Sequence, residues 1–166
     1  PVMGQVASGY AGGSLFHEPG ELRVALRRVE HSARLLAAVG INRVSLNNVN
    51  VHAHEATLLT TRLDQVARLA EIFRAQGIAV LLSVSFASPI VLGGLETSDP
   101  LDTEVQTWWR TAVEAVYARI PDFGGFVVKA DSEGQPGPFA YGRDHADGAN
   151  LLARALAPFG GEVFWR

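Results

Sequence analysis

An α/β fold with parallel strands joined by helices is the fold class that this sequence predicts. Stretches with apolar residues at three- and four-residue steps alternate along the chain with short apolar runs, giving four helices and four strands. Each strand also ends in polar or charged residues, where barrel enzymes gather side chains from several strands. We therefore expect a partial (β/α)8 TIM barrel. Periodicity alone leaves a doubly wound sheet open as the alternative.

The first strand is expected to end in a binding rim. Residues 1–20 are rich in glycine and small residues, which predicts a loop, and a helix follows from Glu21 until Gly40. The strand expected over 41–49 runs into the amides of 47–50. The buried face of the preceding helix is predicted from the residues Leu22, Leu26, Val29, Ala33, Leu36 and Ala37.

The second and third helices have equally clear apolar faces. Residues 63–73 predict an amphipathic helix, and the apolar run 78–84 predicts the strand after it. A long loop is expected over 85–100. The third helix is expected to begin after Asp102, whose carboxylate suits an N-cap, and to end at Pro121.

The last two units contain the most polar strand end. The strand predicted over 123–128 leads directly into the polar segment 129–137, which ends in a Gly/Pro turn. A fourth helix is expected over 145–157, and the last strand over 162–166.

Composition narrows the function classes. Hydrophobic residues make up 48% of the 166 and charged residues 19%, which is typical of a globular domain or part of one. The net charge of -3, without a basic cluster, argues against nucleic acid as a partner. We find no signal peptide, no membrane-spanning run and no cysteine. The location stays open, with an intracellular one favoured. Pro1 is no initiator residue, so we expect a longer parent protein.

Glu133 is the candidate general acid. It lies among a cation, a second carboxylate and an amide directly after an apolar strand. A carboxyl at such a position could protonate a leaving oxygen if an apolar wall raised its pKa. The alternative is that Asp131 and Glu133 cap the turn or pair with Lys129.

Lys129 and Arg166 are candidate ligands for a substrate carboxylate. They lie at the ends of consecutive strands, so in a parallel sheet they could converge on one anion, which arginine would bind with paired N–H donors. The alternative from spacing alone is an ion pair with Asp131 or Asp147.

Other conspicuous residues have weaker interpretations. His52 and His54 lack a third ligand at a recognisable spacing, so no metal site is predicted. Trp108 and Trp109 lie on a helix that should pack outside the barrel, and we assign at least one of them to the core. The glycine pairs 93–94 and 124–125 fit no phosphate-binding pattern, which disfavours a nucleotide.

Several segments of the chain resemble the α-glucuronidases of glycoside hydrolase family 67. The resemblance covers nearly the whole chain, although residues 1–8 lack the aromatic and acidic residues that the family has there. The run Lys129-Ala130-Asp131-Ser132-Glu133-Gly134-Gln135-Pro136-Gly137-Pro138 is the most specific of these segments. The others include Gly9-Tyr10-Ala11-Gly12, Asn47-Asn48-Val49-Asn50, Phe86-Ala87-Ser88-Pro89, Gly93-Gly94-Leu95, Asp99-Pro100-Leu101-Asp102, Ile120-Pro121-Asp122-Phe123-Gly124-Gly125-Phe126, Tyr141-Gly142-Arg143, His145-Ala146-Asp147-Gly148-Ala149-Asn150 and Phe164-Trp165-Arg166.

The resemblance implies that residues 1–166 are a fragment of a (β/α)8 catalytic domain. The implied reaction removes glucuronic acid, or its 4-O-methyl ether, from xylooligosaccharides with inversion and without a metal or cofactor. Glu133 would be the general acid, and Lys129 and Arg166 would bind the uronate. The sugar pocket would be lined by Asn48, Val49 and Asn50.

The resemblance also implies that the base activating the water lies on strands beyond Arg166. We therefore expect this piece alone to be inactive, and a homodimeric parent is one arrangement that the resemblance allows. Two other functions stay open: a non-catalytic carbohydrate-binding barrel module, and a barrel hydrolase acting on a different uronate.

Overall fold

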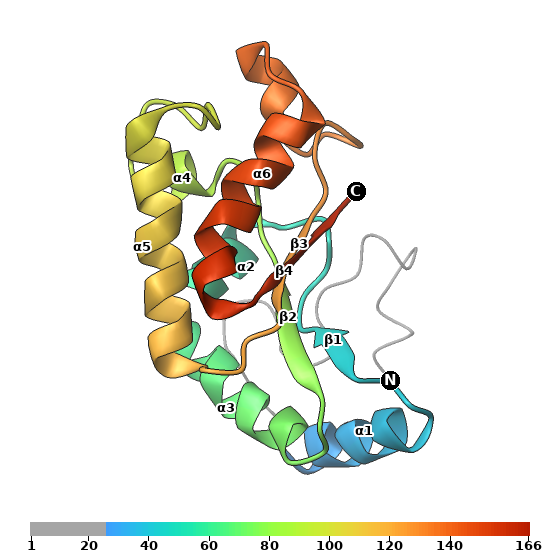
Figure 1. The fold of residues 1–166 in the computed structure, drawn as a ribbon. Coiled ribbons are helices and arrows are strands. Elements are labelled where there is room, and N and C mark those ends of the chain that lie inside the picture. The colour runs from blue at the N-terminus through green and yellow to red at the C-terminus, as the bar shows by residue number, and fades with distance from the viewer. Residues whose placement is uncertain (1–25) are drawn as a thin grey trace.

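A single parallel sheet organises the protein. The structure is a computed structural model and describes residues 26–166. The strands β1 (Arg43–Ser45), β2 (Ala79–Ser83), β3 (Gly125–Val128) and β4 (Glu162–Trp165) are all parallel and lie side by side in sequence order (Figure 1). A doubly wound sheet reverses its strand order, whereas a barrel adds each strand next to the previous one. The predicted partial (β/α)8 architecture is confirmed.

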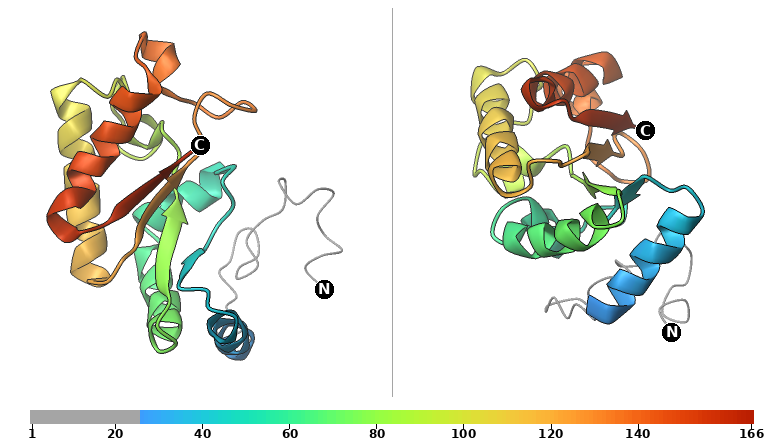
Figure 2. Two further views of the ribbon diagram at one scale, coloured as in Figure 1. Left: turned by 45° about the vertical axis from the view of Figure 1, so that its right-hand side comes forward. Right: turned by 60° about the horizontal axis from the view of Figure 1, so that its bottom comes forward.

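Four long helices lie along one side of this curved sheet, as the right-hand view of Figure 2 shows. They are α1 (Leu26–Ala38), α3 (Leu63–Arg74), α5 (Thr103–Arg119) and α6 (His145–Leu156). Each alternates with a strand, as predicted. The predicted loop over 1–20, the helix start at Glu21 and the Gly9-Tyr10-Ala11-Gly12 segment lie outside the described residues.

Local chemistry sets the helix ends that were predicted. Asp102 is the N-cap of α5, where its carboxylate accepts hydrogen bonds from the backbone nitrogens of Glu104, at 2.8 Å, and Val105, at 3.2 Å. Gly40 follows α1 with a φ of +80°, a conformation that glycine adopts without strain. Both boundaries were therefore visible in the sequence.

The first strand is shorter than predicted, and Asn47 explains why. The Nδ2 of Asn47 donates to the carbonyl oxygen of Ser83 at 2.9 Å, and its Oδ1 accepts from the Ser83 nitrogen at 2.8 Å. A side chain thus takes the two backbone groups of β2 that a longer β1 would have paired. The chain bends away from the sheet after the Leu46 nitrogen has bonded to the Leu81 carbonyl oxygen, so the prediction of a strand over 41–49 was too long.

Sequence periodicity missed the short helical elements. These are α2 (Ala53–Ala56), η2 (Thr57–Leu59), α4 (Ser88–Val91), η3 (Pro138–Tyr141) and η4 (Ala157–Phe159). Each is at most four residues long and too short to show a repeating apolar face. Two of them, α2 and η3, follow the strand ends that carry candidate site residues.

The core lies between the sheet and the long helices. Trp109 is fully buried and packs against Phe126 of β3, with ring centroids 5.8 Å apart, so the assignment of one tryptophan to the core is confirmed. Gly125 permits β4 to approach β3, because a Cβ there would lie 1.9 Å from the Glu162 carbonyl oxygen. No helix within residues 26–166 has the length and apolar character needed to cross a membrane.

Candidate functional site

The candidate residues lie at one edge of the sheet. Residues 48–50 follow β1, residues 129–133 follow β3, and Arg166 follows β4. Because all strands are parallel, these segments leave the sheet at the same end, as Figure 1 shows. In open and closed α/β sheets alike, ligands bind at this carboxyl-terminal edge.

Lys129 is the centre of the site. Its side chain has no solvent exposure, which is rare for lysine and demands partners for the ammonium. The Nζ atom donates to Oδ1 of Asn50 at 2.8 Å and forms an ion pair with the carboxylate of Glu133. Three candidate residues from two different strand ends are therefore in contact.

Arg166 lies opposite Lys129 in the sheet. Its backbone nitrogen donates to the carbonyl oxygen of Val128 at 2.9 Å, and its carbonyl oxygen accepts from the nitrogen of Ala130 at 3.0 Å. In a parallel ladder this bonding pairs Arg166 with Lys129 and directs both side chains to the same face. The charge of Arg166 also acts on Glu133 by lowering the pKa of its carboxyl.

Glu133 is ionised more easily than an ordinary glutamate. Its side chain is 57% exposed, and the hydrogen bond from the Lys129 ammonium, followed by the charge of that ammonium, lowers its pKa. The condition that an apolar wall raises this pKa is not met here, because the carboxyl faces water and contacts a cation. The alternative stated for Glu133, pairing with Lys129, is the arrangement that forms.

The other pairing considered for Lys129 does not occur within the described residues. Asp131 instead accepts a hydrogen bond from the backbone nitrogen of Phe139 at 3.2 Å and so closes its own loop. Asp147 takes part in the capping box of α6 with Asp144. Lys129 is thereby left to Glu133 and Asn50.

The loop that carries Glu133 has an unusual backbone. Asp131 and Glu133 both have a φ of +51°, a backbone conformation that residues other than glycine rarely adopt. Gly137 is required by close packing, because a Cβ there would lie 2.2 Å from Oδ2 of Asp131. Such strained residues cost about 1–3 kcal/mol each and cluster at active sites and ligand clamps.

The loop after β1 presents Asn50 to Lys129. Asn48 accepts a hydrogen bond from the Asn50 backbone nitrogen on its Oδ1 at 2.8 Å, which folds the segment into a tight turn. Val49 between them is partly buried. Asn48 and Asn50 thus build the loop, while Asn47 anchors it to β2.

Sequence reasoning missed Glu55. This glutamate lies in α2 with only 1% of its surface exposed, and burial raises the pKa of its carboxyl. It takes part in a capping box whose N-cap residue is His52. The usual sequence signature of that motif has serine or threonine in this position, so the pattern was not visible.

A second ion pair ties together the loops after β2 and β3. The guanidinium of Arg143 binds the carboxylate of Asp99 through its Nη2, 2.9 Å from Oδ2, and its Nε, 3.0 Å from Oδ1. This bidentate contact lowers the pKa of Asp99. It fixes the segment that follows the Glu133 loop.

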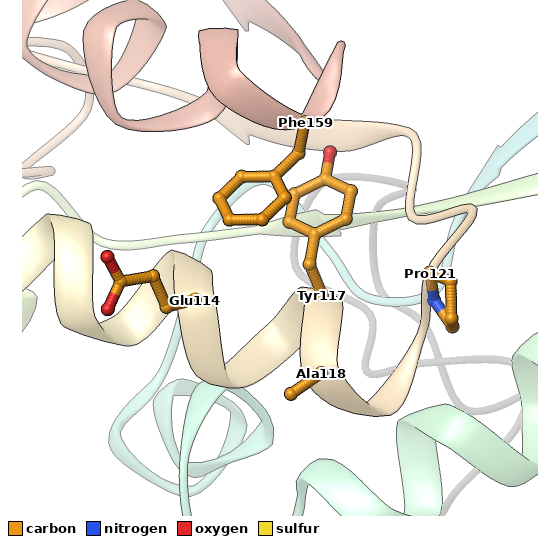
Figure 3. A pocket seen from close by; sticks show the side chains of 5 residues that line it. All are labelled: Glu114, Tyr117, Ala118, Pro121 and Phe159. Carbon is orange, nitrogen blue, oxygen red and sulfur yellow. The ribbon is translucent and has the colours of Figure 1, made fainter.

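Two other features do not add to this site. The rings of His52 and His54 are stacked with centroids 6.3 Å apart, and in residues 26–166 no three His, Cys, Asp or Glu side chains gather as metal ligands would. A hollow of about 430 Å³ lies at the opposite end of the sheet, where Tyr117 and Phe159 stack (Figure 3). In barrels that end serves stability.

Comparison with known proteins gives a family match over almost the whole chain. Residues 2–166 match the family described as "Glycosyl hydrolase family 67 middle domain". The chain is 53% identical over 163 residues to "Alpha-glucuronidase A" of Emericella nidulans and 51% identical to "Probable alpha-glucuronidase A" of Aspergillus fumigatus. Each match covers 98% of this chain and 19% of the relative, so the chain spans about a fifth of the length of these relatives.

Solved structures support the fold. A GH5_18 protein from Bifidobacterium longum subsp. infantis aligns with a TM-score of 0.52 at 16% identity, covering 84% of this chain and 38% of that one. A GH5_18 protein from Bifidobacterium longum subsp. longum, solved in complex with Manb1-4GlcNAc, aligns with a TM-score of 0.53 at 12% identity. At such low identity the likeness concerns the fold alone.

Proposed function

Because this chain belongs to glycosyl hydrolase family 67, we propose that its parent protein is an α-glucuronidase that removes glucuronic acid, or its 4-O-methyl ether, from substituted xylooligosaccharides. The observation that carries the proposal is the buried ammonium of Lys129 at the carboxyl-terminal edge of the sheet, with Arg166 opposite it. Two cations directed to one face form a site for an anion, and a uronate is the sugar that supplies one.

The substrate carboxylate would bind between these two cations. Arg166 would hold it with paired N–H donors, and Lys129 would contribute a point charge that Asn50 orients through the 2.8 Å hydrogen bond. Asn48, Val49 and Asn50 form the adjoining loop and would line the sugar pocket. Of these three, Asn50 has the strongest support because it contacts Lys129 directly.

Binding of the uronate explains how Glu133 becomes an acid. In the free site the Glu133 carboxylate lies on Lys129, where the substrate carboxylate would bind. A uronate that takes this place removes the hydrogen bond that lowers the pKa of Glu133, and the sugar shields the carboxyl from water. Both changes raise the pKa, so Glu133 takes up a proton when the substrate is bound.

The chemistry that follows is an inverting hydrolysis. The proton passes from the Glu133 carboxyl to the glycosidic oxygen while the bond from that oxygen to the uronate C1 breaks, and the xylose leaves as an alcohol. A water attacks C1 from the opposite face and gives a proton to a second carboxylate. We assign that base to the later strands beyond Arg166, as the resemblance implies.

The ion pair that Glu133 forms in the substrate-free protein is also compatible with a second, non-catalytic function. An exposed carboxylate paired with lysine, with no second carboxylate beside it in residues 26–166 as a base, also suits a module that binds glucuronic acid without cleaving it. Such a module would bind glucuronate in the parent protein but release no xylooligosaccharide.

The anomeric form of the first product tests the proposed reaction. Proton NMR of the parent protein with an aldouronic acid should show β-glucuronic acid first, which then mutarotates to the equilibrium mixture. Inversion is expected because the base acts through a water. If α-glucuronic acid appeared first, the inverting mechanism would be wrong. Binding without any release would favour the non-catalytic module.

A further inference from the structure

Glu55 is a buried carboxyl with a direct connection to the loop that carries Asn50. Its Oε2 accepts a hydrogen bond from the His52 backbone nitrogen at 3.3 Å. Glu55 therefore holds the His52 end of the segment 48–52 directly, and the backbone of Asn48 at the other end lowers the pKa of its carboxyl. Within residues 26–166 its other oxygen, Oε1, is buried without a hydrogen-bond partner.

Burying this carboxyl costs free energy of desolvation, so its position inside the protein needs a physical reason. Removing a carboxylate from water costs several kcal/mol of hydration free energy, which only a paired charge or good hydrogen bonds can offset. Burial accordingly raises the pKa of Glu55. The His52 backbone hydrogen bond and the neighbouring His54 and His52 side chains act in the opposite direction and lower this pKa. An N-cap contact on a four-residue helix brings little stability in return.

The contacts continue from Glu55 to the candidate site. Within the loop that Glu55 holds at His52, the Asn48 side chain accepts a hydrogen bond from the Asn50 nitrogen at 2.8 Å. Asn50 in turn accepts from the ammonium of Lys129 at 2.8 Å. The loop that the buried carboxyl anchors at His52 thus reaches the buried cation through Asn50.

We propose that Glu55 is a positioning residue that fixes the Asn48–Asn50 loop and, through Asn50, the ammonium of Lys129. The inference rests on the proposed uronate site and adds a residue that touches neither the sugar nor the reacting atoms. Since Lys129 would bind the uronate, a loosened loop weakens substrate binding more than it slows the proton transfer from Glu133.

A matched pair of substitutions in the parent protein separates this role from a structural one. Glu55→Met keeps the length of the side chain and removes both acceptors, whereas Glu55→Gln retains one oxygen that can accept from the loop. We expect Glu55→Met to raise KM for an aldouronic acid roughly 10-fold with a smaller change in kcat, and Glu55→Gln to stay within about 3-fold. Exposed Glu30→Gln serves as the control and should leave both constants unchanged.

A double-mutant cycle with Asn50→Ala makes the test independent of folding yield. Unfolded molecules lower the apparent kcat but leave KM unaffected. If Glu55 acts through Asn50, Glu55→Met should raise KM in the Asn50→Ala background by less than about 3-fold. Equal increases in both backgrounds, or a KM of Glu55→Met equal to that of the unsubstituted protein, would overturn the proposal.

Glucuronate binding keeps this result separate from the proposed hydrolysis. If the parent protein cleaves no aldouronic acid, the proposed function fails, and the same cycle is then measured as Kd for glucuronate by calorimetry. A weaker Kd for Glu55→Met, restored by Glu55→Gln, would still support the positioning role. An unchanged Kd would overturn it.

Discussion

Glu133→Gln in the parent protein is expected to lower kcat on an aldouronic acid by ~10²- to 10⁴-fold. Glutamine keeps the size of the side chain and a hydrogen-bonding group near Lys129, but it has no proton to give to the xylose oxygen. KM should not rise and is expected to fall, because the uronate would bind to Lys129 and Arg166 and no longer has to displace a carboxylate from Lys129. Steady-state kinetics of the purified variant measure both constants.

The leaving group provides the control for Glu133. In an aryl glucuronide made from an acidic phenol, the leaving phenolate needs no proton. The kcat for this substrate should therefore fall by less than about 10-fold in the same variant. A variant that is merely damaged would lose activity on both substrates alike. An equal loss on both would therefore contradict the assignment of Glu133 as the general acid.

Lys129→Met is expected to lower kcat/KM for an aldouronic acid by ~10²- to 10³-fold. Methionine fills the buried space, but the uronate loses the charge that the structure holds between Asn50 and Glu133. The effect should fall mainly on KM. Kinetics with the uronic acid methyl ester as a second substrate measure how much of the loss belongs to the carboxylate.

The ester is the informative comparison because it has no negative charge. The unsubstituted protein should discriminate strongly between acid and ester, and Lys129→Met should lose most of this preference. Arg119→Met is the matched control and should keep this preference, because exposed Arg119 ends α5 where the chain enters β3, at the opposite end of the sheet from the site. A Lys129→Met variant that still preferred the acid to the same degree would rule out Lys129 as a uronate ligand.

The sequence predicted those parts of the fold that depend on repeated apolar positions. The four strands, the four long helices and the N-cap at Asp102 follow from periodicity and from local hydrogen bonding, and all were found. The strand order was not predictable from periodicity, because a doubly wound sheet shares the same alternation. The short helices and the early end of β1 depend on single side chains such as Asn47.

The proximity of the candidate residues was predictable from the sequence, but their contacts were not. Lys129 and Arg166 could be paired from their positions at consecutive strand ends, and the ladder bonds bring them opposite each other. The pKa of Glu133 could not be foreseen, since it depends on which atom its carboxylate contacts after the chain has folded. Glu55 was not predicted from the sequence because its capping partner is a histidine and because its burial arises from tertiary packing.

The exchange of carboxylates on Lys129 is tested most directly by counting protons. Calorimetric titration of the parent protein with glucuronate near pH 6, repeated in buffers with different ionisation enthalpies, gives the number of protons taken up on binding. The pKa of Glu133 is lowered in the free site, and the uronate would remove the Lys129 contact that lowers it, so a net uptake of protons is predicted on binding, which Glu133→Gln should abolish. Binding without proton uptake, or with the same uptake in Glu133→Gln, would show that the substrate does not convert this carboxylate into the acid.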